Sequence, residues 1–331
     1  MHLNFYSSLR CVLTLAMAGA AALGAIEASA QAYPSKPVRV LIGQPPGGVQ
    51  DTLLRGVTTE LTRVWGQAVT LEHRVGATGV VAAVAAARSA PDGYTIFFST
   101  STNMNTAQFL QKNLPYSPEK DFIPVVGMGQ TKAIMVAGKH VPANNVRELV
   151  ALAKAKPGAL NYGSFGVGSS AHLDVEAFAK AAGFTATHVP YKSGAEVMTA
   201  LMAEQVDFGM TGLTAAIPLV NSGRLKGLSY TGDQRAAAIP QVPTLAEAGY
   251  GGFETGGMFS LYVPAGTPQA IMDKIANDTT AIRSTAVFRE KILTANGMED
   301  FPLQRAALIA RLQKSREDFA LRVKGLDIVM N

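Results

Sequence analysis

The sequence predicts an α/β protein built from two units of similar design. Strand-like and helix-like segments alternate along most of the chain, which is the pattern of a parallel sheet covered by helices. A glycine-rich turn follows a strand in each unit, and the 331 residues exceed the about 250 at which single cores stop growing. Apolar residues make up 48% of the chain, so general disorder is excluded.

Residues 1–30 have the order of features found in secretory signal peptides. A basic residue precedes an apolar stretch over residues 11–26, and Ala-Ser-Ala at 28–30 is a small-x-small cleavage pattern. A transmembrane anchor is the alternative, but the stretch is shorter than the roughly 20 residues that a span needs. We expect cleavage after Ala30, no membrane anchor in the mature protein, and a location in the periplasm or outside the cell.

Charge and cysteine content exclude several classes of protein. The chain carries 29 basic and 24 acidic residues without a Lys/Arg run, so we expect no nucleic-acid partner. Its single cysteine, Cys11, lies in the predicted signal peptide, so a disulfide in the mature chain is excluded. The five histidines show no metal-ligand spacing. We expect no metal and no cofactor.

The first unit is predicted as strand, helix, strand, helix and strand. These segments cover residues 38–42, 50–65, 68–72, 80–88 and 94–99. The second unit continues the alternation with strands at 133–137, 161–164, 186–190, 206–211, 225–231 and 257–263, and helices at 145–156, 172–182 and 193–204. Helices at 269–283, 286–295 and 304–321 complete the chain and are expected to pack back on the first unit.

Two glycine loops are the main candidate sites. Each follows a strand and opens a helix, one at residues 44–51 and the other at 164–172. Glycines let a ligand approach the backbone, and the free N–H groups of a helix start favour an anion. Neither loop contains Lys or Arg, so a carboxylate fits better than a phosphate. Both loops are also compatible with ordinary strand-to-helix turns, and Asp51 with a first-turn acid favoured by the helix dipole.

Further polar residues follow strands in each unit. The polar run Ser99-Thr100-Ser101-Thr102-Asn103 follows the third strand, and we take Ser99 and Ser101 from it as candidates. Thr211 and Thr214 take the corresponding place in the second unit. The carboxyl ends of parallel strands are where open sheets bind ligands. Helix capping explains these residues equally well.

Enzyme signatures are weak. The segment 166–171 fits G-x-G-x-x-A, but the next strand is not followed by the acid that binds a ribose. Neither a G-x-S-x-G elbow nor a G-K-[ST] motif occurs. Ser169, His172 and Asp174 lie at a helix start and do not define a triad. We expect His172 to support its loop.

A set of motifs in fixed order closely resembles the Bug family, the periplasmic receptors of tripartite tricarboxylate transporters. The motifs are Tyr-Pro-Ser-Lys-Pro at 33–37, Pro-Pro-Gly-Gly-x-x-Asp at 45–51, Ala-Pro-Asp-Gly-Tyr at 90–94, Pro-Gly-Ala-Leu-Asn-Tyr at 157–162, His-Val-Pro-Tyr-Lys at 188–192, Val-Pro-Thr-Leu-Ala-Glu-Ala-Gly at 242–249 and Pro-Ala-Gly-Thr-Pro at 264–268.

The resemblance implies a two-lobed periplasmic binding protein, a type II-like flytrap whose hinge is made of crossing strands. We expect crossings near 125–136 and 253–263, one lobe from 31–130 plus 256–331, and the other from 131–255. It also implies that both glycine loops hold one carboxylate, partly through water, that the receptor serves membrane permease subunits, and that it lacks catalytic residues. We expect a monomer. The predicted ligand-binding residues are Pro46, Gly47, Gly48, Gln50, Asp51, Ser99, Ser101, Ser164, Phe165, Gly168, Ser169, Ser170, Thr211 and Thr214.

Several positions depart from the common family pattern. Val49, Gln50, Phe165 and Val167 stand where small polar residues are frequent, and Met258 replaces a frequent Trp. We therefore hypothesise an acid less hydrophilic than citrate, an aromatic mono- or dicarboxylate; the alternative is that these side chains pack in the core. An exported hydrolase or oxidoreductase, and a receptor that feeds a sensor kinase, remain alternative functions.

Overall fold

The computed structural model describes residues 33–111, 113–251 and 255–323. The predicted signal peptide, residues 1–30, lies outside them. The helices and strands described below all belong to one compact unit that begins at Lys36.

The first sheet contains the strands of the first predicted unit and three strands from later in the chain. Its order in the described residues is β11-β4-β10-β3-β1-β2. β1 pairs in parallel with β2 and β3, as the sequence predicted, whereas β10 runs antiparallel to β3 and β4, so the sheet is mixed. The strands are β1 (Val38–Ile42), β2 (Val69–His73), β3 (Thr95–Thr100), β4 (Phe122–Thr131), β10 (Met258–Pro264) and β11 (Met298–Glu299).

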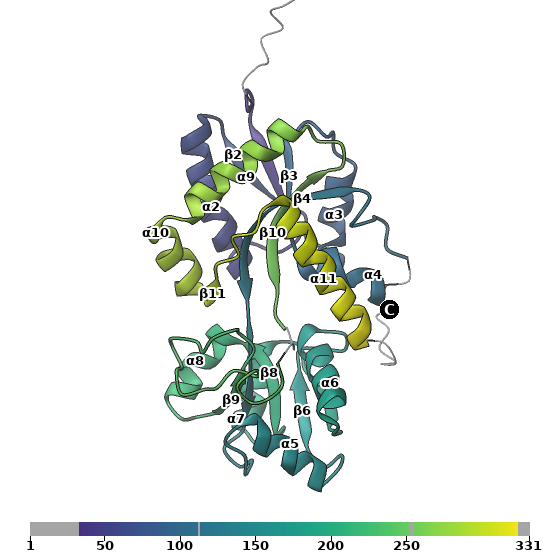
Figure 1. Ribbon diagram of the computed structural model, residues 1–331, viewed down its shortest axis with the longest axis vertical. Coiled ribbons are helices and arrows are strands. Elements are labelled where there is room, and N and C mark those ends of the chain that lie inside the picture. The colour runs from purple at the N-terminus through teal and green to yellow at the C-terminus, as the bar shows by residue number, and fades with distance from the viewer. Residues whose placement is uncertain (1–32, 112, 252–254, 324–331) are drawn as a thin grey trace, which may run out of the picture. The chain divides into compact units, whose positions relative to one another are not determined.

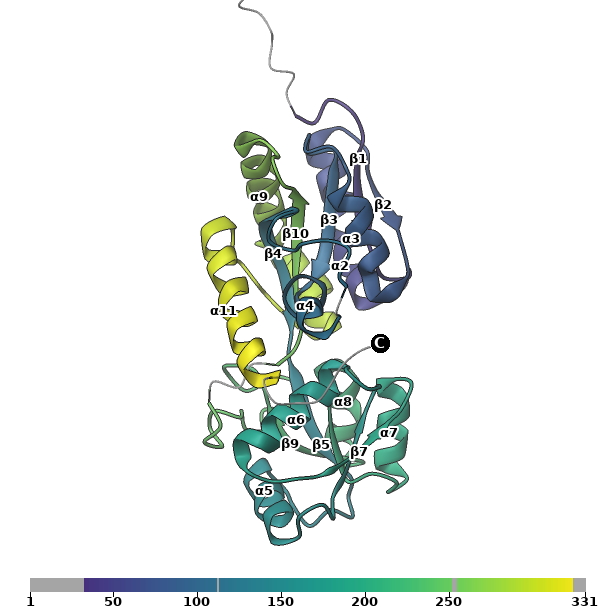
Figure 2. The same cartoon turned by 90° about the vertical axis from the view of Figure 1, so that its right-hand side faces the viewer.

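The helices of this sheet come from both ends of the described chain. As predicted, the C-terminal helices return to it: α9 and α11 pack on β4, and α9 also contacts α2 (Figures 1 and 2). The helical segments are α2 (Val49–Trp65), η1 (Ala77–Gly79), α3 (Val80–Ala87), the π-helix η2 (Thr102–Thr106), α4 (Ala107–Leu110), α9 (Gln269–Arg283), α10 (Ala286–Phe288), the π-helix η3 (Arg289–Leu293), η4 (Thr294–Asn296) and α11 (Arg305–Val323).

The second sheet has the order β7-β6-β8-β5-β9 in the described residues. β6 pairs in parallel with β7 and β8, and β5 is antiparallel to β8 and β9. Apolar clusters cover it, one around Phe178 and Phe208 and one around Val197 and Tyr230. Its elements are β5 (Ala133–Ala137), α5 (Val146–Ala155), β6 (Asn161–Ser164), α6 (Ser170–Ala182), β7 (Thr187–Pro190), α7 (Gly194–Met202), β8 (Phe208–Gly212), α8 (Leu213–Asn221) and β9 (Lys226–Tyr230).

The chain crosses between the two sheets at Lys132, the single residue between β4 and β5. It returns just before β10. The two crossings are bonded together: the N–H of Thr131 donates to the Gly257 carbonyl at 2.8 Å, and the Gly257 N–H donates to Thr131 Oγ1 at 3.0 Å. Gly256 has a φ of +104°, and a Cβ there would lie 2.0 Å from the Thr131 carbonyl oxygen, so only glycine fits. The fold is two-lobed and α/β, with one sheet in each lobe.

Several segments differ from the sequence prediction, among them β4, η2, α4 and β11, which were not predicted as elements. The helix expected at 286–295 is divided into α10, η3 and η4. Helix α8 was not predicted, and it contains Pro218, a residue that normally ends a helical pattern. Ser193 caps α7, since its Oγ accepts from the Glu196 N–H, and Glu196 Oε2 accepts from the Lys192 N–H at 3.0 Å.

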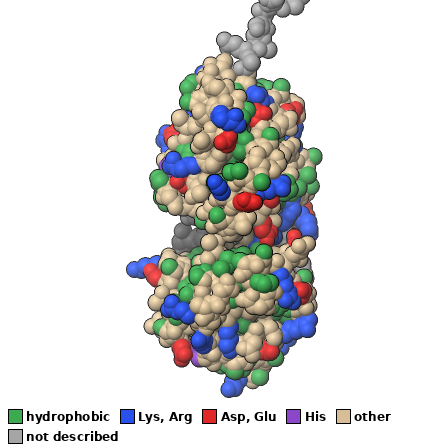
Figure 3. Space-filling model, turned by 90° about the vertical axis from the view of Figure 1, so that its left-hand side faces the viewer, with side chains coloured by type: hydrophobic (Ala, Val, Ile, Leu, Met, Phe, Trp, Pro, Cys, Tyr) green, Lys and Arg blue, Asp and Glu red, His purple; other side chains and the backbone are tan. Residues whose placement is uncertain are grey.

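The surface agrees with the charge composition. Lys and Arg side chains are interspersed with Asp and Glu on the face in Figure 3, which shows no continuous basic area. None of the described helices combines the length and apolarity needed to cross a bilayer.

Candidate functional site

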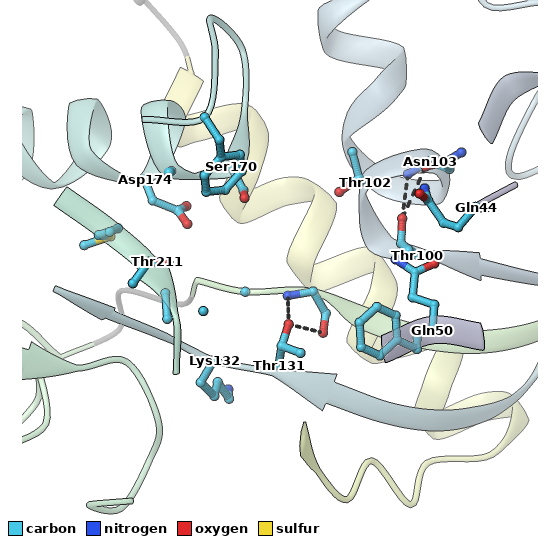
Figure 4. A pocket seen from close by; sticks show the side chains of 18 residues that line it. Gln44, Gln50, Thr100, Thr102, Asn103, Thr131, Lys132, Ser170, Asp174 and Thr211 are labelled. Atoms are coloured by element: carbon cyan, nitrogen blue, oxygen red, sulfur yellow. Dashed lines mark hydrogen bonds between the residues drawn. The ribbon is translucent and has the colours of Figure 1, made fainter. Parts of the chain in front are cut away.

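A cavity of about 300 Å³ lies between the two sheets, where the strands cross. Both lobes contribute to its wall, in which uncharged polar side chains are the most numerous kind. In Figure 4, side chains from α6 and β8 face side chains from the first lobe across this space. The lining residues are Gln44, Gln50, Thr100, Thr102, Asn103, Thr131, Lys132, Ala133, Phe165, Ser170, Ala171, Asp174, Met210, Thr211, Gly212, Gly256, Gly257 and Phe259.

The first glycine loop reaches the cavity through its ends. Gln44 follows β1, Gln50 lies in the first turn of α2, and both line the wall. The exposed Pro46, Gly47 and Gly48 between them do not. Gly48 is the N-cap of α2 and supplies no side-chain cap, so the positive end of this 17-residue helix remains open to an anion.

Asp51 holds this loop instead of lining the cavity. It is 4% exposed and accepts hydrogen bonds from the Gly47 N–H at 3.0 Å and from Arg55 Nε at 2.8 Å. His73 Nε2 lies 3.2 Å from its other oxygen. Burial alone would raise the pKa of Asp51, but the bonds from Arg55 and Gly47 outweigh it and hold the pKa below its ordinary value. The Gly47 amide is thus used inside the loop and does not face a ligand.

The second glycine loop also presents a first-turn residue to the cavity. Ser170 begins α6, and Phe165 precedes it in the loop; both line the wall. Ser169 is the N-cap, and its Oγ accepts from the His172 N–H. The Gly168 N–H donates to His172 Nδ1 at 3.0 Å, so the expected supporting role of His172 is confirmed.

A stack of aromatic rings lies next to the second loop and supports it. The ring centroids of His172 and His188 lie 3.9 Å apart with an 8° angle between the ring planes, and Tyr162 stacks on His188. His188 Nε2 is 2.6 Å from the Oγ of Ser164, a fully buried residue that therefore supports the loop rather than the cavity wall. Burial, together with the neighbouring His172, lowers the pKa of His188 to about 4. Burial lowers the pKa of His172 as well, so both rings are neutral at pH 7.

Residues at and just after the end of β3 contribute to the wall. Thr100 in β3 and Thr102 and Asn103 in η2 line the cavity, whereas the predicted Ser99 and Ser101 do not. Ser99 lies inside the strand, where successive side chains point to opposite faces. Ser101 Oγ accepts from the Met258 N–H across to β10. The sequence identified the correct strand end but the wrong side of it.

Thr211 lines the cavity from the end of β8, whereas Thr214 does not. The Thr214 hydroxyl donates to the Asn296 carbonyl at 3.0 Å, which joins α8 to η4 of the other lobe. The crossing strand adds Lys132, a lysine with only 6% exposure. Within the described part of the chain its ammonium group makes no ion pair, so it leaves positive charge beside the cavity.

Three apolar side chains complete the wall: Phe165, Met210 and Phe259. Among the departures from the family pattern, Gln50 and Phe165 thus reach the cavity. Val49 and Val167 are exposed outside its wall, and Met258 is buried in the core of the first lobe.

Of the predicted ligand-binding residues, four line the cavity: Gln50, Phe165, Ser170 and Thr211. The others hold the loops, lie in the exposed first turn or bond elsewhere: Pro46, Gly47, Gly48, Asp51, Ser99, Ser101, Ser164, Gly168, Ser169 and Thr214. Sequence reasoning missed Gln44 and Asp174, although each had a signal. Gln44 opens the first glycine loop, two residues after β1, and Asp174 is one helical turn from Ser170 and hence on the same face.

The arrangement suits an organic anion. Two helix amino ends converge from different lobes, amide and hydroxyl groups surround them, and one lysine adds charge. Among the described residues, no group of three or more His, Cys, Asp or Glu side chains is placed to hold a metal.

Residues 53–318 match the family described as tripartite tricarboxylate transporter family receptor. The chain belongs to this family. It is 32% identical to the protein BugT of Bordetella pertussis over 261 residues, which cover 78% of this chain and 80% of BugT. The resemblance to the Bug proteins is therefore confirmed.

Solved structures agree. Rpa4515 of R. palustris, solved with adipate, is 28% identical, has a TM-score of 0.75, and the match covers 90% of this chain and 99% of Rpa4515. MatC of Rhodopseudomonas palustris, solved with malate, is 28% identical and has a TM-score of 0.70. The match covers 88% of this chain and 100% of MatC. The tripartite tricarboxylate receptors are periplasmic solute-binding proteins and not enzymes.

Proposed function

We propose that this receptor binds a small organic carboxylate in the cavity and delivers it to the membrane subunits of a tripartite transporter. The observation that carries the proposal is the convergence of Gln50 and Ser170, the first-turn residues of α2 and α6, on one cavity. Two helix amino ends from different lobes favour one negative group between them. The family and the carboxylates bound by Rpa4515 and MatC support this assignment.

The wall favours an acid with a compact apolar body. The volume of about 300 Å³ is at the lower end for ligand pockets. Phe165 and Phe259 approach from different lobes, and Met210 adds a third apolar surface. We favour an aromatic mono- or dicarboxylate over citrate, and competition of citrate against benzoate and against a benzene dicarboxylate tests this preference.

Binding would close the lobes around the acid. A ligand that touches both lobes stabilises the closed arrangement by the contacts it lacks in the open one. The paired crossings at Thr131 and Gly257 are the proposed hinge. We keep the lobe boundaries of the sequence analysis as part of the proposal, together with cleavage after Ala30, a periplasmic location and a monomeric state.

A thermal-shift screen of the chain from Gln31 onward against organic acids tests the proposal. An acid present at about 100 times its Kd adds about 2.7 kcal/mol to the free energy of unfolding, which raises Tm by several degrees for a chain of this length. Gln50→Glu and Ser170→Asp place a carboxylate at each helix start and should weaken binding at least about tenfold.

Thr59→Glu is the matched control, because Thr59 is exposed on α2 and does not line the cavity. This variant should bind as the unsubstituted protein does. Equal affinity in all three variants would show that the acid binds elsewhere. Loss of uptake in a deletion strain would separate transport from a role in signalling, which predicts loss of gene induction instead.

A further inference from the structure

The two sides of the cavity differ in chemistry. Gln44 and Gln50 supply amide groups on the first-lobe side, next to the uncapped start of α2. Ser170, Asp174 and Thr211 supply hydroxyl and carboxylate oxygens on the second-lobe side. Figure 4 shows these three opposite Gln44 and Thr102. A ligand that spans the cavity therefore meets different partners at its two ends.

Asp174 is the one acid among the described residues that line the cavity. It lies one helical turn beyond Ser170 on the same face of α6 and is half-buried. With Ser170 and Thr102 it also borders a smaller adjoining pocket of about 70 Å³, so it forms part of the wall between the two spaces. A carboxylate has about four acceptor sites, so Asp174 can accept from a ligand whatever else it binds.

The formal charges of the residues that line the cavity sum to zero. Lys132 contributes one positive charge and Asp174 one negative charge, and the other lining residues are uncharged. Asp51 is nearby in sequence, but it lies outside the wall: Gly47 and Arg55 both donate to its Oδ2, and His73 Nε2 lies 3.2 Å from its Oδ1. Lys132 and the start of α2 can hold one carboxylate, whereas a second carboxylate near Asp174 meets a like charge in a partly enclosed space.

We propose that Asp174 makes the receptor selective for monocarboxylates whose other end donates a hydrogen bond, an alcohol or an amine, over dicarboxylates. This inference rests on the proposed function, since it requires that an acid binds in the cavity. It separates this receptor from Rpa4515 and MatC, which were solved with the dicarboxylates adipate and malate.

Two sets of matched acids test the proposal by titration calorimetry. The first contains hexanoate, its omega-hydroxy and omega-amino derivatives, and adipate. The second contains benzoates whose para substituent is methyl, hydroxymethyl, aminomethyl or carboxylate. Within a set only the far end changes. The hydroxyl or amine compound should bind about tenfold or more tightly than the dicarboxylate, because like charges are disfavoured and the donor gains an acceptor.

Asp174→Asn removes the charge with almost no change in shape. It should bring the affinities for the donor compound and the dicarboxylate to within about threefold of each other. Glu204→Gln is the matched control, since Glu204 is an exposed acid of the same lobe outside the cavity wall. It should leave the ratio unchanged. Thermal unfolding of each free variant checks that the fold is retained.

The outcomes are distinguishable. Dicarboxylates that bind as tightly as their hydroxyl partners, or an unchanged ratio in Asp174→Asn, would overturn the role of Asp174 and leave the carboxylate receptor intact. No measurable binding by any acid of either set would overturn the proposed function and this inference with it.

Discussion

The two glycine loops both place a residue in the cavity wall, but different kinds of side chain hold them in position. Both follow a parallel strand, and both place a first-turn residue, Gln50 or Ser170, in the cavity wall. The first loop is held by a buried carboxylate, Asp51. The second is held by a neutral imidazole, His172, together with a serine cap. Similar backbone geometry can thus be stabilised by an acid in one lobe and a base in the other.

The two loops are held differently because α2 and α6 differ in their N-terminal caps. α2 begins at Gly48 without a side-chain cap, and the first-turn acid Asp51 supplies the negative charge that this end favours. α6 has its cap in Ser169, so its loop needs only an acceptor for the Gly168 N–H. The first helix start therefore lacks a side-chain cap, although Asp51 already places negative charge in its first turn.

The largest expected effect is loss of the acid that holds the first loop. Asp51→Ala should lower the free energy of unfolding by about 2–4 kcal/mol, because Arg55, His73 and the Gly47 N–H lose a buried charged partner. Urea unfolding measures it. Glu60→Ala on the same helix removes an exposed partner of Arg63 and should cost at most about 1 kcal/mol. Equal costs would contradict the assigned role of Asp51.

Acid should weaken the second loop before the first. Unfolded histidines take up protons near their ordinary pKa of about 6.5, whereas in the fold His188 has a pKa of about 4 and that of His172 is also lowered. Between these values the unfolded chain binds more protons, so stability falls as pH drops from about 6.5 to 4. Asp51, whose pKa is lowered, contributes stability that is lost only below its unfolded pKa of about 3.9.

Urea unfolding at a series of pH values checks this order. His188→Gln retains a donor toward Ser164 but does not take up a proton in this pH range. It should therefore flatten the decline in the free energy of unfolding between about pH 6.5, the unfolded pKa of histidine, and about pH 4, the pKa of His188 in the fold. A decline of unchanged slope in this variant would mean that other groups cause it.

The smallest expected effect comes from removing the N-cap serine of α6 or adding one to α2. Ser169→Ala should cost about 1 kcal/mol of stability, and Gly48→Ser should add a few tenths. Gly48 has extended backbone angles, and a Cβ there meets no atom within 4 Å. If the start of α2 binds the acid, Gly48→Ser should raise the Tm of the free protein yet weaken binding, because the new hydroxyl occupies an N–H group. Stronger binding would contradict the role of this helix start.

Much of the fold follows from local patterns. The strands at 38–42, 133–137 and 161–164 have the predicted bounds, and α2 and α6 begin within two residues of the prediction. These elements have a clear apolar period and glycine or proline at their ends. Helix α8 lacks that signal because of Pro218, and the two-residue β11 exists only through its pairing with β4.

The site was predicted less completely than the fold. Both predicted loops contribute a residue to the cavity wall, but strand alternation placed Thr100 rather than Ser99 there. Lys132 and Phe259 come from crossing strands far apart in sequence, and a spacing rule does not bring them together.

The sequence by itself determined which segments form helices and strands, where two loops present a helix start, and which family the chain resembles, because these depend on neighbouring residues. Only the tertiary structure decided which groups face the cavity. The N–H groups of Gly47 and Gly168 turned inward to Asp51 and His172, while Asp174 and Lys132 reached the wall. The reason is physical: a buried polar group must find a partner, and the fold sets which partner is near.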